Sequence, residues 1–405
     1  MTSSSGFDDA TLRRFADLMV GFGANVQPGQ IVSIGGDVGK EEVVRALAES
    51  AYRHGATFVD ASYFDLHIKH ARLRYAPPDT LDFVPSWYGE RILALGDQRC
   101  ARIALSGPIA PGLLDDIDPA LIGRDQLPFL RESGKVVNDA TTNWTIGPCP
   151  SIPWATLVHP DLEPDAALEK LVGELVHVLR LDEEDPVAVW SARADALVTA
   201  ATRLTERRFD ALHFEGPGTD LRVGLLPSSR FRAARFQTVD GIVHMPNLPT
   251  EEVFSTPDPL RTEGVVRSTK PLVVGGSIIR GLEVEFKAGS VTRIDAEENA
   301  DVLRGYTSKD AGAARLGEVA LVDREGRIGR LGTTFFDTLL DENAASHVAL
   351  GSAYAECLED PADRERMNES QIHIDFMIGA DDVSVTGVTA DGERVPVLVG
   401  GDWQL

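Results

Sequence analysis

Hydrophobic and polar positions along the first half of the chain alternate between helical spacing and short apolar runs. Residues 8–24 and 41–56 place apolar side chains at helical spacing, and the two patterns end near Gly23 and Gly55. Strand–helix–strand order with short loops predicts a mostly parallel sheet flanked by helices. Residues 108–128 and 142–155 are interrupted by proline and glycine and are predicted as irregular loops. The strand candidates are QIVSIGG at 30–36, TFVDASY at 57–63 and CARIALSG at 100–107.

The second half starts with helical patterns and then becomes rich in strands. This order predicts an α/β N-terminal domain with a mostly parallel sheet, followed by a β-rich α+β C-terminal domain that carries the metal site discussed below. We place the boundary between the domains at 190/191, which gives domains 1–190 and 191–405. The helical patterns cover 165–181 and 186–209, the strand candidates 210–215 and 221–226, and the hairpins 277–296 and 383–399, with turns at Ala288–Gly289 and Asp391–Gly392.

The composition is that of a globular enzyme and argues against several functional classes. A length of 405 residues exceeds one ordinary hydrophobic core, which favours two domains. The formal net charge of −24 argues against nucleic acids and anionic membranes as partners. No apolar run reaches the roughly 18 residues that a membrane span needs. The first residues lack the apolar stretch of a secretory signal and the three cysteines lie far apart, so we expect a cytoplasmic protein without disulfides.

Acidic side chains and histidines recur in four short, largely apolar segments between residues 251 and 375. A lone charge among apolar neighbours is costly to bury. A pair of divalent metal ions would neutralise several such groups together, and paired metal ions are typical of hydrolases. The segments are NLPTEEVF with Glu251 and Glu252, LGEVALV with Glu318, DENAASHVALGSAY with Glu342, His347 and Tyr354, and HIDF with His373 and Asp375.

The spacing within two of these segments is compatible with a metal site but does not require one. If residues 371–378 form a strand, His373 and Asp375 project from the same face and make half of a metal site, although this pattern is a weak signal alone. Glu318 lies inside an apolar run and therefore needs a partner. Pairing with an arginine such as Arg315 is the competing explanation.

The other two segments leave similar alternatives. Glu342 and His347 do not share one face of an ideal helix, so a loop that turns into a helix at 343–345 would have to bring them together. Tyr354 would then lie two helical turns beyond His347, where its phenol could donate a hydrogen bond to a developing oxyanion. A helix-start acid at Glu342 and a core aromatic at Tyr354 are the alternative. The side chains of the adjacent residues Glu251 and Glu252 point in different directions, so at most one of them is a direct metal ligand.

Taken together, the segments NLPTEEVF, LGEVALV, DENAASH with its downstream tyrosine, and HIDFMIG resemble, in order and spacing, the thermophilic-type metallo-aminopeptidases (the aminopeptidase T, AmpS and PepS family, peptidase family M29). The resemblance runs through nearly the whole chain. It implies a catalytic tyrosine at Tyr354, and Glu252 is preferred to Glu251 because its separation from Glu318 fits the family. The metal ligands that it implies are Glu252, Glu318, Glu342, His347, His373 and Asp375.

The resemblance also implies the activity of the chain. We expect a metal-dependent aminopeptidase that hydrolyses N-terminal residues from short peptides, with two divalent ions per chain (zinc, cobalt, manganese or magnesium) activating a water. The non-ligating member of Glu251 and Glu252 is a candidate to carry the proton to the leaving amine. The family is similar to dimers that enclose a cavity, so we also expect a homodimer.

Two alternatives to an aminopeptidase come from different functional classes. One is a mononuclear iron ring-cleaving dioxygenase of the related fold, and the extra glutamates Glu252, Glu318 and Glu342 argue against it. The other is a non-catalytic oligomeric scaffold that has kept the fold. Metal content separates the first alternative from a peptidase, and hydrolysis of a leucine p-nitroanilide separates the second.

Overall fold

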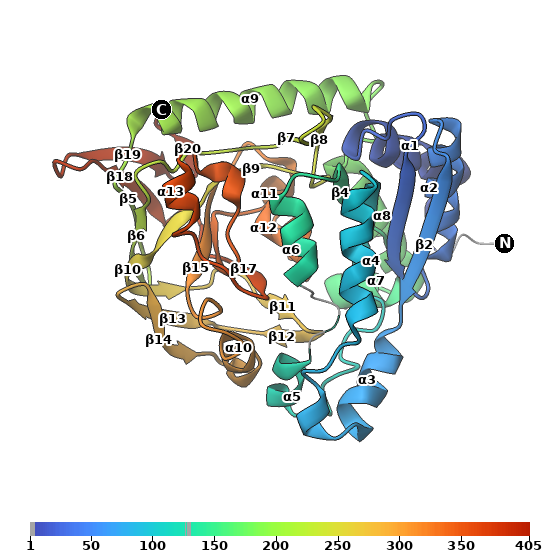
Figure 1. The fold of residues 1–405 in the computed structure, drawn as a ribbon, viewed down its shortest axis with the longest axis horizontal. Helices are drawn as coiled ribbons and strands as arrows, with labels where there is room; N and C mark the ends of the chain where they lie inside the picture. Colours follow the sequence, from blue (N-terminus) through green and yellow to red (C-terminus); the bar gives the residue numbers. More distant parts are fainter. Residues whose placement is uncertain (1–4, 126, 128–130) are drawn as a thin grey trace.

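The computed structural model describes residues 5–125, 127 and 131–405, and its first part is a parallel sheet covered by helices (Figure 1). The strands run in the order β2-β1-β3-β4 and pair in parallel throughout, as the sequence predicts. They are β1 (Ile31–Asp37), β2 (Phe58–Phe64), β3 (Ala101–Ser106) and β4 (Trp144–Pro148). The helices that accompany them are α1 (Asp9–Asp17), α2 (Glu41–Arg53), α3 (Leu66–Tyr75), α4 (Ser86–Asp97), α5 (Pro119–Arg124), α6 (Arg131–Asn138), α7 (Ile152–Val158) and α8 (Pro164–Val178).

The two segments predicted as irregular loops contain regular elements, so those predictions are wrong. Residues 142–155 contain β4 and the start of α7. Their prolines occupy tolerated positions: Pro148 ends the strand, and Pro153 lies in the first turn of α7, where the Ser151 hydroxyl accepts a hydrogen bond from the Trp154 amide. Residues 108–128 contain α5, which Asp118 caps, while residues 126 and 128 of that segment lie outside the described residues.

The C-terminal part is rich in strands, as predicted. An antiparallel sheet has the order β14-β13-β10-β6-β5-β18-β19-β20. Both predicted hairpins are confirmed: β13 and β14 turn at Ala288–Gly289, β18 and β19 around Gly392, and the turn residues have positive φ. The strands are β5 (Ala211–Gly216), β6 (Thr219–Leu225), β10 (Pro257–Arg267), β13 (Glu283–Lys287), β14 (Ser290–Asp295), β18 (Ser384–Val388), β19 (Arg394–Val399) and β20 (Asp402–Trp403).

A third sheet carries most of the chemistry-bearing segments. Its order is β17-β16-β15-β9, and every pairing in it is antiparallel. One face of this sheet joins the hydrophobic core through side chains such as Val319, Val348 and Phe376. The four strands are β9 (Glu252–Ser255), β15 (Leu316–Val322), β16 (His347–Gly351) and β17 (His373–Met377), and the short helix α12 (Thr338–Glu342) precedes β16.

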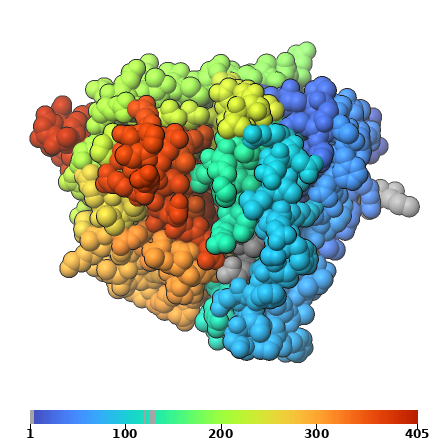
Figure 2. All heavy atoms as spheres, in the orientation of Figure 1, coloured from blue at the N-terminus to red at the C-terminus, as the bar shows by residue number. Residues whose placement is uncertain are grey.

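The long helix α9 (Pro186–Arg207) runs along the top of the molecule and leads from the N-terminal to the C-terminal part (Figure 1). The predicted boundary at 190/191 lies inside this helix, where Trp190 is fully buried and its indole donates to the Leu179 carbonyl. One hydrophobic cluster contains residues of both halves, and Figure 2 shows the N-terminal and C-terminal segments lying against each other. The division into 1–190 and 191–405 stays a prediction. Within the described part of the chain, no helix is long and apolar enough to cross a membrane.

Gly351 at the end of β16 holds the backbone geometry of the third sheet, and its replacement tests this role. Its φ is +109°, and a Cβ built there would lie 2.1 Å from the Ile372 carbonyl oxygen. Gly351→Ala is therefore expected to lower the free energy of unfolding by roughly 2 kcal/mol or more and to weaken metal binding by displacing His373. Gly392, with φ +88° and open space around it, is the matched control. Urea denaturation that gives equal losses for Gly351→Ala and Gly392→Ala would contradict this account.

Candidate metal centre

Five of the six predicted metal ligands lie on one face of the sheet β17-β16-β15-β9. Side chains alternate between faces along a strand, so His373 and Asp375 share a face, as predicted. The register places Asp375 beside Ala349, and Ala349 beside Glu318. His347 pairs with Ala320, and Glu252 pairs with Val322 at the edge strand. Two-residue periodicity and antiparallel register thus collect acids and imidazoles that are far apart in the sequence.

Small residues lie between these ligands on the same face. Ala320 and Ala349 occupy the positions across from His347 and Asp375, and Gly351 pairs with His373. None of these three side chains extends beyond a methyl group, so the longer side chains of the ligands converge above them. Cross-strand neighbours have Cβ atoms about 4.5–5.5 Å apart, close enough for their terminal atoms to meet at one ion.

The ligand atoms form two groups that share Glu318. In the first group, His347 Nε2 lies 3.1 Å from Glu252 Oε2 and 3.7 Å from Glu318 Oε1. In the second, His373 Nε2 lies 3.2 Å from Glu318 Oε2 and 3.4 Å from Asp375 Oδ1. Atoms bound to one tetrahedral ion at about 2.0–2.1 Å are separated by about 3.3 Å. The separations in both groups are close to that value.

Both histidines present Nε2 to the centre because Nδ1 is already engaged. His347 Nδ1 lies 3.1 Å from the Ala345 carbonyl oxygen, and His373 Nδ1 lies 2.8 Å from that of Ser352. A carbonyl oxygen only accepts hydrogen bonds, so Nδ1 carries the proton in each ring. The neutral ring then keeps a lone pair on Nε2, as metal-binding histidines do.

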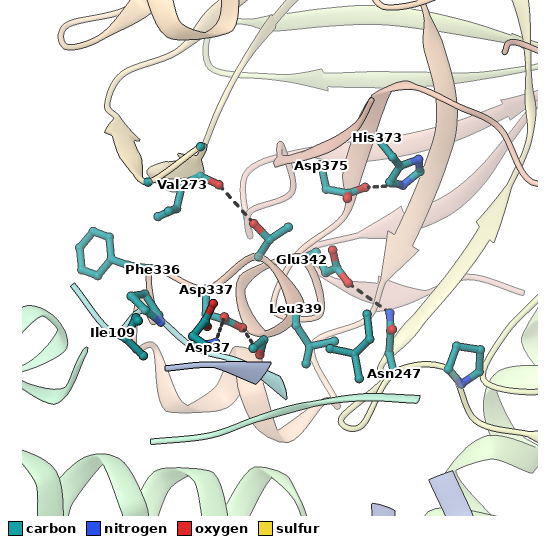
Figure 3. Close-up of a pocket in the computed structure, with 18 of the residues that line it drawn as sticks. Asp37, Ile109, Asn247, Val273, Phe336, Asp337, Leu339, Glu342, His373 and Asp375 are labelled. Carbon is teal, nitrogen blue, oxygen red and sulfur yellow. Dashed lines mark hydrogen bonds and ion pairs between the residues drawn. The ribbon is translucent and has the colours of Figure 1, made fainter. Parts of the chain in front are cut away.

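Glu342 reaches the same cavity from α12 and lies outside both groups. Its Oε1 accepts hydrogen bonds from the side-chain amides of Asn247 at 3.2 Å and Asn343 at 3.4 Å. Figure 3 shows Glu342 directed towards the space into which Asp375 and His373 also point. The Asn343 side chain in addition accepts the Glu251 amide at 2.6 Å, which fixes α12 against β9. Sequence reasoning missed both asparagines, although they lie within the NLPTEEVF and DENAASH segments.

The predicted path from His347 to Tyr354 is wrong. Residues 347–351 form the strand β16 and not a helix, because β15 and β17 pair with them on both sides. The chain leaves this strand at Gly351, and Tyr354 lies in the following turn. Its ring nevertheless reaches the centre, with its centroid 5.2 Å from that of His373, and packs against Phe236 and Phe254.

The structure also separates Glu251 from Glu252. Glu251 is fully buried and pairs with Arg180 at 2.9 Å and with Arg193 at 2.5 Å, on the side of β9 away from the centre. With both oxygens held by guanidinium groups, it is not placed to carry a proton to a leaving amine, so that suggestion is wrong.

The alternative partner for Glu318 is not found either. Arg315 donates to the carbonyl oxygens of Pro259 and Ala288 instead. Within the described residues, the ion pairs of Glu318 are with His347 and His373.

Burial and mutual repulsion shift the titration of the centre. Burial, reinforced by the charges of Asp375 and Glu252, raises the pKa of Glu342 well above its ordinary value. Burial also raises the pKa of Glu252, and burial with the nearby carboxylates raises the pKa of Tyr354 well above 10, so the phenol stays protonated at neutral pH. Burial opposes protonation of the two histidines, yet the carboxylates beside them raise the pKa of His347 and His373 well above 6.5.

The centre lies in a cavity of about 560 Å³ between the third sheet and the carboxyl ends of the parallel strands. Asp37 and Phe64 at the ends of β1 and β2 line it, together with apolar side chains such as Ile109 and Phe336 (Figure 3). Open parallel sheets commonly bind ligands at this end. Buried carboxylates and imidazoles that present Nε2 to them are the donor set that suits zinc, cobalt or manganese. The residues therefore fit divalent metal ions.

Comparisons with known proteins agree with a metal-binding site and extend over nearly the whole chain. A family model described as thermophilic metalloprotease (M29) matches residues 8–403. The chain is 40% identical over 402 residues to aminopeptidase T of Thermus aquaticus, covering 97% of this chain and 98% of that protein, and 36% identical to aminopeptidase PepS of Streptococcus thermophilus. The structure of wild-type AmpT from Thermus thermophilus superposes with a TM-score of 0.86 at 39% identity, covering 98% of this chain and 99% of that one.

The contrast between Glu251 and Glu252 predicts opposite consequences of the same substitution. Glu251→Ala leaves the buried Arg180 without its carboxylate and the partly buried Arg193 with Asp323 alone, and it is expected to lower the free energy of unfolding by about 3–5 kcal/mol, whether or not metal is present. Glu252→Ala removes one of four crowded carboxylates, so the metal-free protein should keep its stability or gain some while metal affinity falls. Thermal unfolding with and without a chelator measures both effects, and equal behaviour of the two variants would contradict the assignment.

The raised pKa values predict how metal removal depends on pH. In the metal-free protein, Glu252, Glu342 and both histidines hold protons at pH values where the unfolded chain, with values near 4.5 and 6.5, has lost them. Their contribution to stability is fully present below those values and is lost as pH rises through the folded-state pKa values. The rise in Tm on adding zinc or cobalt should therefore grow between about pH 5 and pH 8. A rise that is the same at every pH would contradict this linkage.

Proposed function

The chain belongs to the thermophilic metalloprotease (M29) family and is a metallo-aminopeptidase, and we propose that it removes N-terminal residues from short peptides with two divalent metal ions. Glu318 carries this proposal, because its two oxygens each lie against a different group of ligands. A carboxylate in that position would help to hold both ions of a pair, and the pair would supply an activated water. The proposed ligands are Glu252, Glu318, Glu342, His347, His373 and Asp375.

The residues of the chain have distinct roles in the proposed reaction. When bound, paired divalent ions lower the pKa of a water and polarise a carbonyl group. The Tyr354 phenol, protonated at neutral pH and beside His373, donates a hydrogen bond to the oxygen that becomes negative as the peptide carbonyl is attacked. Asn247 and Asn343 hold the Glu342 carboxylate in place, and the carbonyls of Ala345 and Ser352 hold the two imidazole rings.

Charge and size support a short peptide as the substrate. The acids of the centre attract the free ammonium group that distinguishes an N-terminal residue from an internal one. A cavity of about 560 Å³ admits a few residues and excludes folded proteins. We propose zinc, cobalt, manganese or magnesium as the ions, with the imidazole donors favouring the first three, and a cytoplasmic homodimer as the working form.

Metal analysis tests the dinuclear proposal. Wild-type protein should contain about two divalent ions per chain. Glu318→Gln removes the carboxylate that both groups share, so this variant should lose both ions. Asp375→Asn should mainly lose the ion held by the group of Glu318, His373 and Asp375. Glu169→Gln, an exposed glutamate on α8, is the matched control. A single iron per chain would favour the ring-cleaving dioxygenase, and no hydrolysis of leucine p-nitroanilide by metal-loaded protein would favour the scaffold.

Tyr354→Phe tests the role of the phenol. The variant should keep its metal content and lower kcat by roughly 10²–10³-fold on leucine p-nitroanilide, because one donor to the oxyanion is lost. Tyr75→Phe, at a tyrosine that is 78% exposed, serves as the control. Near-full activity of Tyr354→Phe would show that another group stabilises the oxyanion.

A further inference from the structure

A second cavity adjoins the main cavity at Trp144, Tyr354 and His373. Its volume is about 440 Å³, and these three residues line it as well as the main cavity. The second cavity covers one face of the parallel sheet, under α4 and α6. Alternation along the strands points Arg102 and Ala104 of β3 and Trp144 of β4 to this face. The two cavities therefore meet at the tyrosine and histidine of the metal centre.

The excess formal charge is negative among the side chains that line the main cavity and positive among those that line the second. The main cavity is lined by the four carboxylates of the centre and by further acids such as Asp37 and Asp337. Among the described residues that line the second cavity there is no aspartate or glutamate, and its formal cations are Arg91 and Arg102. A free short peptide has the matching polarity, with an ammonium group at one end and a carboxylate at the other.

Arg102 differs from the other cations that line these cavities because it has no protein partner in the described part of the chain. Arg91 forms an ion pair with Asp60, Lys40 lies 2.6 Å from Asp37, and Lys69 lies 3.3 Å from Asp125. The Arg102 guanidinium makes no hydrogen bond or ion pair with any described residue. It is only partly exposed, on a sheet surface kept open by Gly35, Ser62 and the exposed Ala104.

The position of Arg102 relative to the centre suits the far end of a bound substrate. Arg102 pairs directly with Trp144 across neighbouring strands about 4.8 Å apart, and Trp144 lines both cavities together with Tyr354. Asn138 of α6 fixes the backbone on both sides of Tyr354, since its side chain donates to the Ala353 carbonyl and accepts the Ala355 amide at 3.0 Å. A peptide whose scissile bond lies at Tyr354 would extend its leaving portion into this cavity.

We propose that Arg102 binds the C-terminal carboxylate of short peptide substrates. The second cavity is then the subsite for the leaving portion of the substrate. The Arg102 guanidinium selects peptides of a few residues with a free C-terminal carboxylate over amidated or longer peptides. A charge-assisted, often bidentate arginine–carboxylate contact supplies the recognition. This inference rests on the proposed aminopeptidase function, and it adds a residue that distinguishes substrates by their C-terminal group.

The test compares Leu-Gly-Gly with its C-terminal amide on metal-loaded enzyme. The readout is the ratio of kcat/KM for the free acid to kcat/KM for the amide. Arg102→Gln is expected to lower this ratio by roughly 10- to 100-fold, mainly through KM for the free acid. Arg102→Lys should restore part of the ratio. Arg91→Gln is the matched control and should change the ratio much less, because Asp60 already neutralises Arg91.

Several results of this comparison would overturn the proposal for Arg102. An unchanged ratio in an active Arg102→Gln enzyme, or an equal loss for acid and amide, overturns the proposal. If Arg102→Gln is inactive on both substrates, Ala104→Glu decides, since it keeps Arg102 and places a competing carboxylate two residues away on the same face. That variant should lower the ratio at least about tenfold, and an unchanged ratio again overturns the proposal. Failure of the wild-type enzyme on both substrates would instead reject the aminopeptidase function.

Discussion

The burial of four carboxylates beside one face of a small sheet, three on its strands and Glu342 on the neighbouring helix α12, is the constraint on which the functional part of this structure depends. Glu252, Glu318, Glu342 and Asp375 are all buried, and each would cost several kcal/mol to bury without a counter-charge. Even with both imidazoles protonated, two negative charges remain uncompensated. Within the described residues these carboxylates form no ion pair with a lysine or arginine. Bound cations are therefore needed for this face to be stable with its acids ionised.

The two faces of the sheet have different roles in positioning these side chains. The opposite face, with Val319, Val348 and Phe376, packs into the core and fixes the strands. The functional face keeps small residues at Ala320 and Ala349, so that the ligands of neighbouring strands converge. Rigid strands hold ligand atoms more accurately than loops do, which suits an ion that tolerates little error in geometry. Packing on one side thus provides the precision that the chemistry on the other side needs.

Adjacent acids at the start of β9 show how strongly the direction of a side chain decides its role. Glu251 is neutralised by Arg180 and Arg193 inside the protein, and Glu252 faces the other predicted metal ligands. The same separation of charge continues at Tyr354, which lines both cavities. Acids surround the centre in the main cavity, and Arg102 lines the second cavity with no ion-pair partner among the described residues. Together the two sides form a site whose polarity matches a free peptide.

The sequence alone determined the elements whose periodicity is strong and local: the strands β1, β2 and β3 of the parallel sheet, the helices α2, α8 and α9, and both hairpins. It also indicated the chemistry, because acids and histidines inside apolar segments must have partners. The path from His347 to Tyr354, the role of Glu251, and the amides that hold Glu342 were decided only by the tertiary structure. These features depend on pairing between strands that are distant in the chain, and neither helical nor strand periodicity records which strands become neighbours.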